Sequence, residues 1–288
     1  MPTICFGQQP SGFFPKRFLI AKIYTARKLR EKIGGKIVYF YHDSDADYRE
    51  TVTLMRDIKT GQEVRLNFTQ ENKIQKKHSP LYLKRISSGW KEEILKQLPR
   101  FVDQAMIDIF KSVEAKTAGD FCLEMYKKMG LLDGIEVVRS SDISFREQAA
   151  FVSSRVRLRR TRDPLTSDKL LNSRDSSSDA LLGMTPQGDW FADVEYQGEI
   201  VRAKIENDGL SLHEGGQVYT KLPKAATIAK LQITPGKDER FNWMNSVIGA
   251  THYIYGEGEN DYLKFTDFPD VKFIERETIN EPNFAWIG

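Results

Sequence analysis

TICFGQQPSG, residues 3–12, decides the fold class of this 288-residue chain. Its first half is a short apolar run typical of a buried strand, and its second half is a loop rich in glycine and proline. Residues 16–32 then place apolar side chains at helical spacing before Gly34, and residues 37–41 form a second apolar run. Strand, loop, helix and strand in this order predict a βαβ unit with parallel strands, and therefore an α/β fold.

The rest of the chain contains further elements and two insertions. Residues 51–70 alternate apolar and polar side chains around Thr60-Gly61, as in a hairpin, and residues 90–128 follow a helical pattern. Short alternating runs between residues 190 and 219 predict a small antiparallel β element. We therefore expect a discontinuous core of residues 1–145 and 226–288 with a hairpin and helical insertion at 51–128, a flexible connection at 146–185, and a small β-rich insertion at 186–225.

Composition narrows the class of protein. The 43 Lys+Arg and 40 Asp+Glu leave a net charge of +3, so no overall field favours nucleic acid or an anionic membrane. Cys5 and Cys122 are too few for a disulfide framework, and each is most simply a small buried apolar residue. With no basic leader and no window of about 18 uninterrupted apolar residues, we expect a cytoplasmic protein with no membrane partner.

The strongest local charge is an arginine run. Residues 155–162 hold five arginines and are followed by a serine-rich stretch at 172–179. Such a run can contact nucleic acid through phosphates, but it lacks interleaved aromatic residues and a recognition motif. We favour a solvated connection over a nucleic-acid partner.

Polar and glycine residues follow the predicted parallel strands. In a parallel sheet the chemistry lies at the carboxyl ends of the strands, which here means the loop after residue 6 and the acidic stretch 42–47. Gly7 allows backbone N–H groups to approach a phosphate, and Gln8 and Gln9 offer amide hydrogen bonds to a sugar or carboxylate. The alternative is that the glycines only permit a tight turn and the glutamines satisfy the loop backbone.

The acidic stretch has several interpretations. Asp45, Asp47 and Glu50 can bind a divalent cation such as Mg²⁺, orient a substrate ammonium, or supply a general base. They can equally form an exposed acidic loop or a charge cluster at a helix N-terminus. We assign no metal site, and we regard His42 as more often structural than catalytic.

Several blocks, in order, resemble the bacillithiol biosynthesis cysteine-adding enzymes, the BshC family. Residues 7–12, which we call the glutamine loop, and the residues up to Lys22 fit the family's opening strand, G-Q-Q loop and lysine-bearing helix without a gap. Residues 253–262, YIYGEGENDY, are close to its Y-x-x-G-P-G-E-x-x-Y block. Weaker similarities lie at residues 44–47 with Glu50, residues 129–131 with 135–138, Arg240, and residues 271–276.

This resemblance implies both a fold and an activity. The fold is a discontinuous Rossmann-like, nucleotidyltransferase-like core that binds an adenine nucleotide, ATP or ADP. The activity is that of a ligase, which joins cysteine or a similar amino acid to the amine of a glucosaminyl-malate-type precursor in low-molecular-weight thiol biosynthesis. The family's C-terminal coiled coil has no counterpart here, so no oligomeric state follows from the resemblance.

The resemblance also implies roles for individual residues. Asp45, Asp47 and Glu259 are the candidate catalytic residues, and Lys22 and Arg240 are candidate clamps for anionic groups. The candidate substrate- and nucleotide-binding residues are Gly7, Gln8, Gln9, Lys22, Arg240, Gly256, Gly258 and Tyr262.

A second hypothesis is a homologue that binds a nucleotide or small molecule without catalysis and serves as a sensor or subunit. Residues 14–16, Phe-Pro-Lys, replace the T-G-P of the family loop, and Ala46 stands where the acidic motif has histidine. With Ala46, no imidazole is available at that position to titrate near neutral pH. The changed loop and the missing coiled coil favour the second hypothesis.

Overall fold

The computed structural model describes residues 1–57, 59–149, 189–207, 209–215, 218–222, 228–279 and 284–286. The chain divides into two compact units. The first comprises Met1–Ser141, Glu195–Val201 and Ala250–Gly288, and the second comprises Asp142–Val194 and Arg202–Gly249. The arginine run at 155–162 and most of the connection expected at 146–185 lie outside the described residues.

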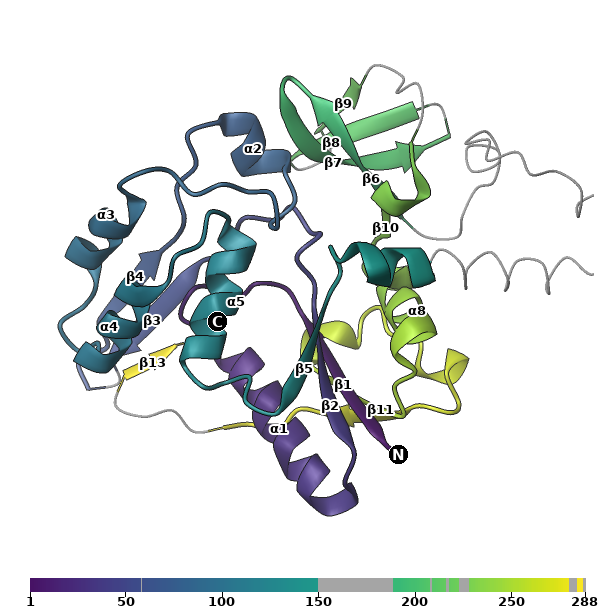
Figure 1. Ribbon diagram of the computed structural model, residues 1–288, viewed down its shortest axis with the longest axis horizontal. Coiled ribbons are helices and arrows are strands. Elements are labelled where there is room, and N and C mark those ends of the chain that lie inside the picture. The colour runs from purple at the N-terminus through teal and green to yellow at the C-terminus, as the bar shows by residue number, and fades with distance from the viewer. Residues whose placement is uncertain are drawn as a thin grey trace, which may run out of the picture. The chain divides into compact units, whose positions relative to one another are not determined.

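A five-stranded parallel sheet forms the centre of the first unit (Figure 1). Every neighbouring pair of its strands is parallel, which confirms the α/β class. Additional antiparallel sheets accompany it. In spatial order the strands are β12 (Lys272–Glu275), β11 (His252–Tyr255), β1 (Thr3–Gln8), β2 (Lys36–Tyr41) and β5 (Ile135–Arg139).

Helix α1 (Arg17–Ile33) connects β1 to β2 and packs against β1, β2 and β11. Its buried face contains Leu19, Ile23 and Ala26, which are the apolar positions that predicted the helix. The helix stops at Gly34, and Gly35 follows with φ of 96°, a left-handed conformation that favours glycine. A Cβ at Gly35 would also lie 2.2 Å from the carbonyl oxygen of Pro2, so the return into β2 requires glycine there.

The insertion in the first unit contains a hairpin and four helices. The predicted hairpin is present as β3 (Thr53–Asp57) and β4 (Glu63–Leu66), and β13 (Phe284–Trp286) pairs with β3. The helical pattern over 90–128 is divided into three helices, because the chain leaves helical geometry at Leu98 and Val113. The helices are α2 (Lys73–His78), α3 (Trp90–Gln97), α4 (Gln104–Ser112) and α5 (Ala118–Lys128).

An aromatic cluster anchors the glutamine loop to this insertion. Phe13, from the loop, is fully buried and lies 5.5 Å from the ring centroid of Trp90 and 5.3 Å from that of Phe110. Phe68 stacks on Trp90 at 4.6 Å. Buried aromatic pairs of this kind contribute about 1 kcal/mol each beyond their burial. The loop that carries the glutamines is therefore tied down by its own following residues.

The second unit holds most of an antiparallel sheet, in the order β10-β6-β7-β8-β9. This is the small antiparallel element that the alternating pattern predicts. Residues 143–149 and α8 (Lys237–Ile248) are helical. The strands are β6 (Trp190–Tyr196), β7 (Glu199–Glu206), β8 (Gly209–Gly215), β9 (Val218–Leu222) and β10 (Ile233–Pro235).

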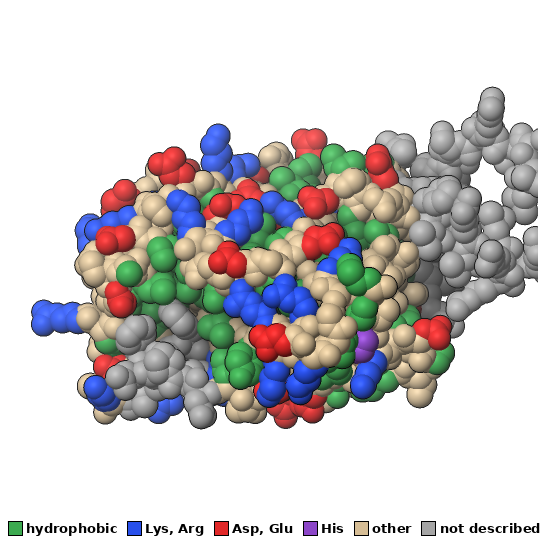
Figure 2. Space-filling model, turned by 60° about the horizontal axis from the view of Figure 1, so that its bottom comes forward, with side chains coloured by type: hydrophobic (Ala, Val, Ile, Leu, Met, Phe, Trp, Pro, Cys, Tyr) green, Lys and Arg blue, Asp and Glu red, His purple; other side chains and the backbone are tan. Residues whose placement is uncertain are grey.

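Two surface properties bear on the kind of partner. In the described part of the chain, no helix has both the length and the apolar character needed to cross a membrane. Figure 2 shows basic and acidic side chains side by side on the face that it draws, in line with a net charge of +3. On that face, charge of one sign is not gathered into a broad field.

Candidate functional site

The candidate site lies at the carboxyl edge of the parallel sheet, where its strand order reverses. From β1 the chain proceeds to β2 on one side, whereas β11 pairs with β1 on the other side. Because β1 and β11 are adjacent and parallel, the loops that follow them leave the sheet at the same edge. Open α/β sheets bind ligands at such a switch point.

One carboxylate, through Lys22 of α1, links the end of β1 to the turn after β11. The Lys22 ammonium donates to the carbonyl oxygen of Gly7 at 2.9 Å and also to the Glu259 carboxylate. That carboxylate accepts two more hydrogen bonds, from the Tyr253 hydroxyl at 2.9 Å and from the backbone N–H of Gly256 at 2.7 Å. Since the Lys22 and Glu259 side chains are only 3% and 14% exposed, they form an ion pair inside the protein.

The close approach of the loops explains two glycines. A Cβ at Gly7 would lie 2.9 Å from the hydroxyl oxygen of Tyr253, so a side chain there would displace a residue that bonds Glu259. A Cβ at Gly256 would lie 3.3 Å from Nε of Arg276 and 3.6 Å from Cε of Lys22. Three charged side chains, those of Lys22, Glu259 and Arg276, thus converge on Gly256.

Arg276 is a residue that the sequence analysis did not select. It follows β12 directly, and its backbone N–H donates to the carbonyl oxygen of Tyr255 at 2.9 Å, which holds it at the carboxyl edge. Its Nε is buried and has no acceptor among the described residues. The available signal is its position, because a basic residue immediately after a strand of a parallel sheet lies at the ligand-binding edge.

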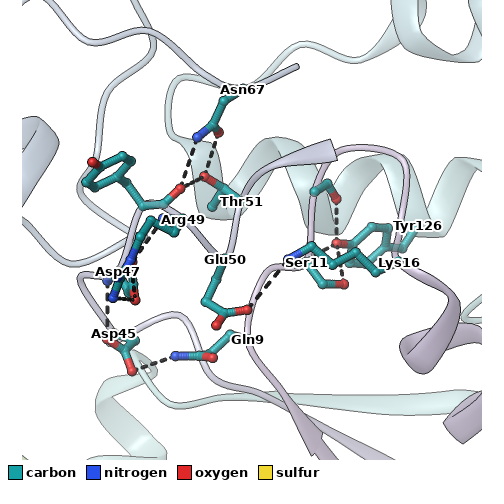
Figure 3. Close-up of polar contacts among 12 residues, drawn as sticks. Gln9, Ser11, Lys16, Asp45, Asp47, Arg49, Glu50, Thr51, Asn67 and Tyr126 are labelled. Carbon is teal, nitrogen blue, oxygen red and sulfur yellow. Dashed lines mark hydrogen bonds and ion pairs between the residues drawn. The ribbon is translucent and has the colours of Figure 1, made fainter. Parts of the chain in front are cut away.

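The acidic stretch contacts the glutamine loop (Figure 3). The Gln9 amide donates to the Asp45 carboxylate at 2.6 Å, and Lys16 lies 3.8 Å from Glu50. Asp45 also accepts from the backbone N–H of Ala46 at 2.7 Å, which orders the turn after it. Asp45 is half-buried, and its carboxylate lies between the ends of β1 and β2.

Asp47 lies nearer the surface than Asp45. Arg49, whose side chain is 76% exposed, donates to both carboxylate oxygens of Asp47 at 2.6–3.2 Å. Partial burial opposes ionisation of Asp47, but the hydrogen bonds from Arg49 outweigh it and lower the pKa of this carboxyl. Asp47 therefore stays ionised in the neutral range, within an exposed ion pair.

A buried lysine supports the acidic stretch from below. The Lys84 side chain is fully buried, and its Nζ donates to the carbonyl oxygens of Ala46 and Lys76, both at 2.8 Å. Burial lowers the pKa of Lys84 to about 7, against the opposing effect of the Asp45 and Asp47 carboxylates. Because Lys84 cannot touch a substrate, its role is to position the Asp45–Asp47 turn. The sequence offered no signal for it, since an isolated lysine usually lies at the surface.

The residues just before Asp45 are structural. Asp43 is fully buried and accepts from Arg139 at 2.7 Å and from Ser140 and Ser141, so it joins the carboxyl ends of β2 and β5. Burial raises the pKa of Asp43, although Arg139 opposes the rise. His42 is 1% exposed and stacks on Phe40 at 5.9 Å, which keeps its ring away from solvent.

The remaining predicted residues have varied surroundings. The carbonyl oxygen of Gln8 accepts from the backbone N–H of His42 at 2.9 Å, and Tyr262 follows Glu259 in the same turn. Gly258 has open space where a Cβ would lie, so the fold does not require glycine there. Arg240 lies on α8, in the second unit.

The reactivity of the two cysteines and the presence of a metal site are the remaining questions about the chemistry of this chain. Cys5 and Cys122 are fully buried, and burial raises the pKa of both thiols, so they remain protonated and unreactive. No group of three or more His, Cys, Asp and Glu side chains within the described ranges is placed to hold a metal ion.

No protein-family model matches the sequence, and no curated protein shows detectable similarity to it.

Proposed function

We propose that this protein is a BshC-like ligase with a Rossmann-like, nucleotidyltransferase-like core. In this proposal it adds cysteine, or a similar amino acid, to the amine of a small glucosaminyl-malate-type precursor. The observation that carries the proposal is the junction of the β1 and β11 loops at the switch point, joined by Lys22 and Glu259. Ligands of open α/β sheets bind at this position.

One observation supports the binding of an adenine nucleotide, ATP or ADP, at this edge of the sheet. A phosphate needs hydrogen-bond donors, and the buried Nε of Arg276 is a donor with no acceptor among the described residues. When bound, the nucleotide would supply activation of the amino acid's carboxylate. The residues proposed to surround it include Gln8 at the end of β1, Gln9 directly after β1, and Gly256 after β11.

The chemistry proposed for the acidic stretch is proton transfer. An amine that attacks the activated carbonyl carbon of the amino acid forms a C–N bond, breaks the bond from that carbon to the activating phosphoryl oxygen, and releases the phosphate group. The amine must also release a proton, which a nearby carboxylate can accept. Asp45 is suited to this role because it is half-buried at the sheet edge and is held by Gln9. Asp47, paired with Arg49, is suited to orienting a substrate ammonium.

The second candidate function is binding without catalysis. It is favoured by the Glu259 carboxylate, which accepts from Lys22, Tyr253 and Gly256 and so has little capacity left to act as a base. In both candidates Glu259 holds the two loops together. The candidates differ in whether Asp45 acts on a bound amine.

The test is a product assay. The full chain is incubated with ATP, cysteine and glucosaminyl-malate, and mass spectrometry looks for an acceptor heavier by one cysteine residue. We expect this product from the wild type, and a loss of at least about 100-fold in Asp45→Asn, the range typical of a lost general base. Asp108→Asn, which removes an exposed carboxylate from α4, is the matched control and should keep full activity.

Calorimetry separates the two candidates. Binding of ATP, ADP or cysteine without any product would support the non-catalytic homologue. Turnover that is unchanged in Asp45→Asn would contradict the proposed role of Asp45. A folded wild type that neither binds these compounds nor makes product would contradict both candidates.

A further inference from the structure

Arg276 is a basic residue at the carboxyl edge whose Nε has no acceptor among the described residues. The charges of Lys22 and Glu259 cancel within their ion pair, and Lys22 also donates to Gly7. Lys28 similarly pairs with Glu277 at 2.8 Å. Arg276 lies close to Lys22 and Glu259 across Gly256, yet it forms no ion pair with any described residue. Lys22 is thus engaged by Glu259, whereas Arg276 has no carboxylate partner in the described part of the chain.

The burial of this group matters as much as its charge. A buried donor without an acceptor costs about 1–3 kcal/mol, and more when it is charged. Such a group persists in a fold when something satisfies it, or when function requires it. The Nε of Arg276 lies 3.3 Å from the position that a Cβ at Gly256 would occupy, so glycine at this position leaves room for the Arg276 side chain.

Two hydrogen bonds order the chain beside Arg276. The Arg276 backbone bonds to Tyr255 at the end of β11, and Glu259 accepts from the backbone N–H of Gly256. The backbone of Arg276 and the loop after β11 are therefore held at the carboxyl edge. A planar guanidinium presents parallel N–H groups, which match the two oxygens of a carboxylate or phosphate.

We propose that Arg276 is the oxyanion-binding residue of this edge, and that it takes a carboxylate or phosphate group of the ligand through its guanidinium. The inference deepens the proposed function and rests on it for the location of the ligand. It moves the role of anion clamp from Lys22 to Arg276. It also predicts that the ligand carries at least one oxyanion.

The test uses binding to the full chain. ATP, ADP, inorganic phosphate, malate and cysteine are titrated by calorimetry into wild type, Arg276→Gln and Lys272→Gln. Lys272 is the matched control, because it is an exposed basic residue at the first position of β12, the strand that Arg276 follows. We expect wild type to bind at least one probe, Arg276→Gln to bind it roughly 10- to 100-fold more weakly, and Lys272→Gln to bind it within about twofold.

The probes distinguish the source of the oxyanion. Binding of phosphate and nucleotides that depends on Arg276 identifies a phosphate site, whereas binding of malate or cysteine with the same dependence identifies a carboxylate site. Equal affinity in wild type and Arg276→Gln would overturn the inference, as would a folded wild type that binds none of the probes at millimolar concentration.

A second measurement reads binding on the wild-type protein and uses a variant only to assign the signal. In wild type the ¹⁵N NMR signal of the Arg276 Nε–H group, assigned by its loss in Arg276→Lys, should shift when the bound probe is added. An unchanged signal at saturation would overturn the inference. Failure of the proposed function looks different, because the protein would then bind the oxyanion through Arg276 and make no ligated product. Conversely, normal ligation by Arg276→Gln with an unchanged KM would contradict the role of Arg276 and leave the proposed function in place.

Discussion

Two regions at the carboxyl edge of the sheet each contain a buried lysine, and the two lysines have acceptors of different charge. At the junction of the β1 and β11 loops, Lys22 is buried against a carboxylate, Glu259. Next to the acidic stretch, Lys84 is equally buried, and among the described residues its hydrogen-bond acceptors are the backbone carbonyl oxygens of Ala46 and Lys76. Burial of a lysine thus has different consequences according to the charge of its acceptor. At Lys84 the acceptors are neutral, so the cost of desolvation is largely unopposed and lowers its pKa to about 7.

The largest expected effect concerns the pH dependence of Lys84. Its pKa is 10.5 in the unfolded chain and about 7 in the folded protein, so between these values the unfolded state binds more protons. This group therefore makes the folded state more stable as pH rises from 7 to 10. Lys84→Met lacks the effect, and the stability of wild type relative to this variant should rise by on the order of 4 kcal/mol over that range, since each pKa unit corresponds to about 1.4 kcal/mol.

The measurement is urea denaturation of both proteins at several pH values. Subtracting the two free energies of unfolding cancels the groups that titrate alike in both. Lys77→Met is the matched control, because Lys77 is an exposed lysine on α2, next to Lys76. Its stability difference from wild type should stay flat. A flat difference for Lys84→Met as well would contradict the contrast between the two lysines.

The second prediction concerns the ion pair between Lys22 and Glu259. Glu259→Gln should lower the free energy of unfolding by about 3 kcal/mol, because it leaves the buried ammonium of Lys22 without its counter-charge. Chemical denaturation at pH 7 measures the loss. Glu257→Gln, an exposed carboxylate in the same 3₁₀ turn, should change the stability by less than about 0.5 kcal/mol. A similar small change in both variants would show that the ion pair does not hold the loops together.

The third prediction concerns the hydrogen bonds from Tyr126 that hold the end of the glutamine loop, at Ser11 and Gly12. The buried hydroxyl of Tyr126 donates to the carbonyl oxygen of Gly12 at 2.6 Å and accepts from the backbone N–H of Ser11 at 3.0 Å. Tyr126→Phe leaves both backbone groups without this partner and should cost about 2 kcal/mol of stability. Tyr24→Phe, which alters an exposed tyrosine on α1, is the control. Equal thermal unfolding midpoints for the two variants would argue against this anchor.

The smallest effect is expected at Asp47. Its partner Arg49 is mostly exposed, so Asp47→Asn should cost less than about 1 kcal/mol, and less still at high salt. Under the proposed function the same substitution should nevertheless reduce ligation strongly. Stability and turnover are measured on one preparation. A large loss of stability would show that Asp47 belongs with the buried groups, such as Asp43, and not with the exposed edge.

Local patterns in the sequence were enough to locate the elements of the core. The helix expected over 16–32 is Arg17–Ile33, and the strand expected over 37–41 is Lys36–Tyr41. The acidic residues at 45 and 47 and the glycine at 256 were also visible as residues that follow strands. The first strand is longer than predicted, because β1 continues through Gly7 to Gln8. Periodicity and strand-end position are properties of neighbouring residues, so a single sequence reveals them.

Pairings between distant residues could not be predicted in the same way. Arg276 and Gly256 are separated by a loop and a strand, and Lys84 reaches Ala46 from a different element. No local pattern marks a lysine that will be buried, or an arginine that will lack a carboxylate. These properties depend on which segments the sheet order places side by side.

Hydrophobic spacing and turn residues act over a few positions, so the order of residues already indicates the first strand, the glycine-rich loop, the helix and the second strand. The folded arrangement alone places β11 beside β1, pairs Glu259 with Lys22, and leaves the Nε of Arg276 without an acceptor among the described residues. Burial and charge pairing are set by contacts in space, and the order of residues along the chain does not specify these contacts.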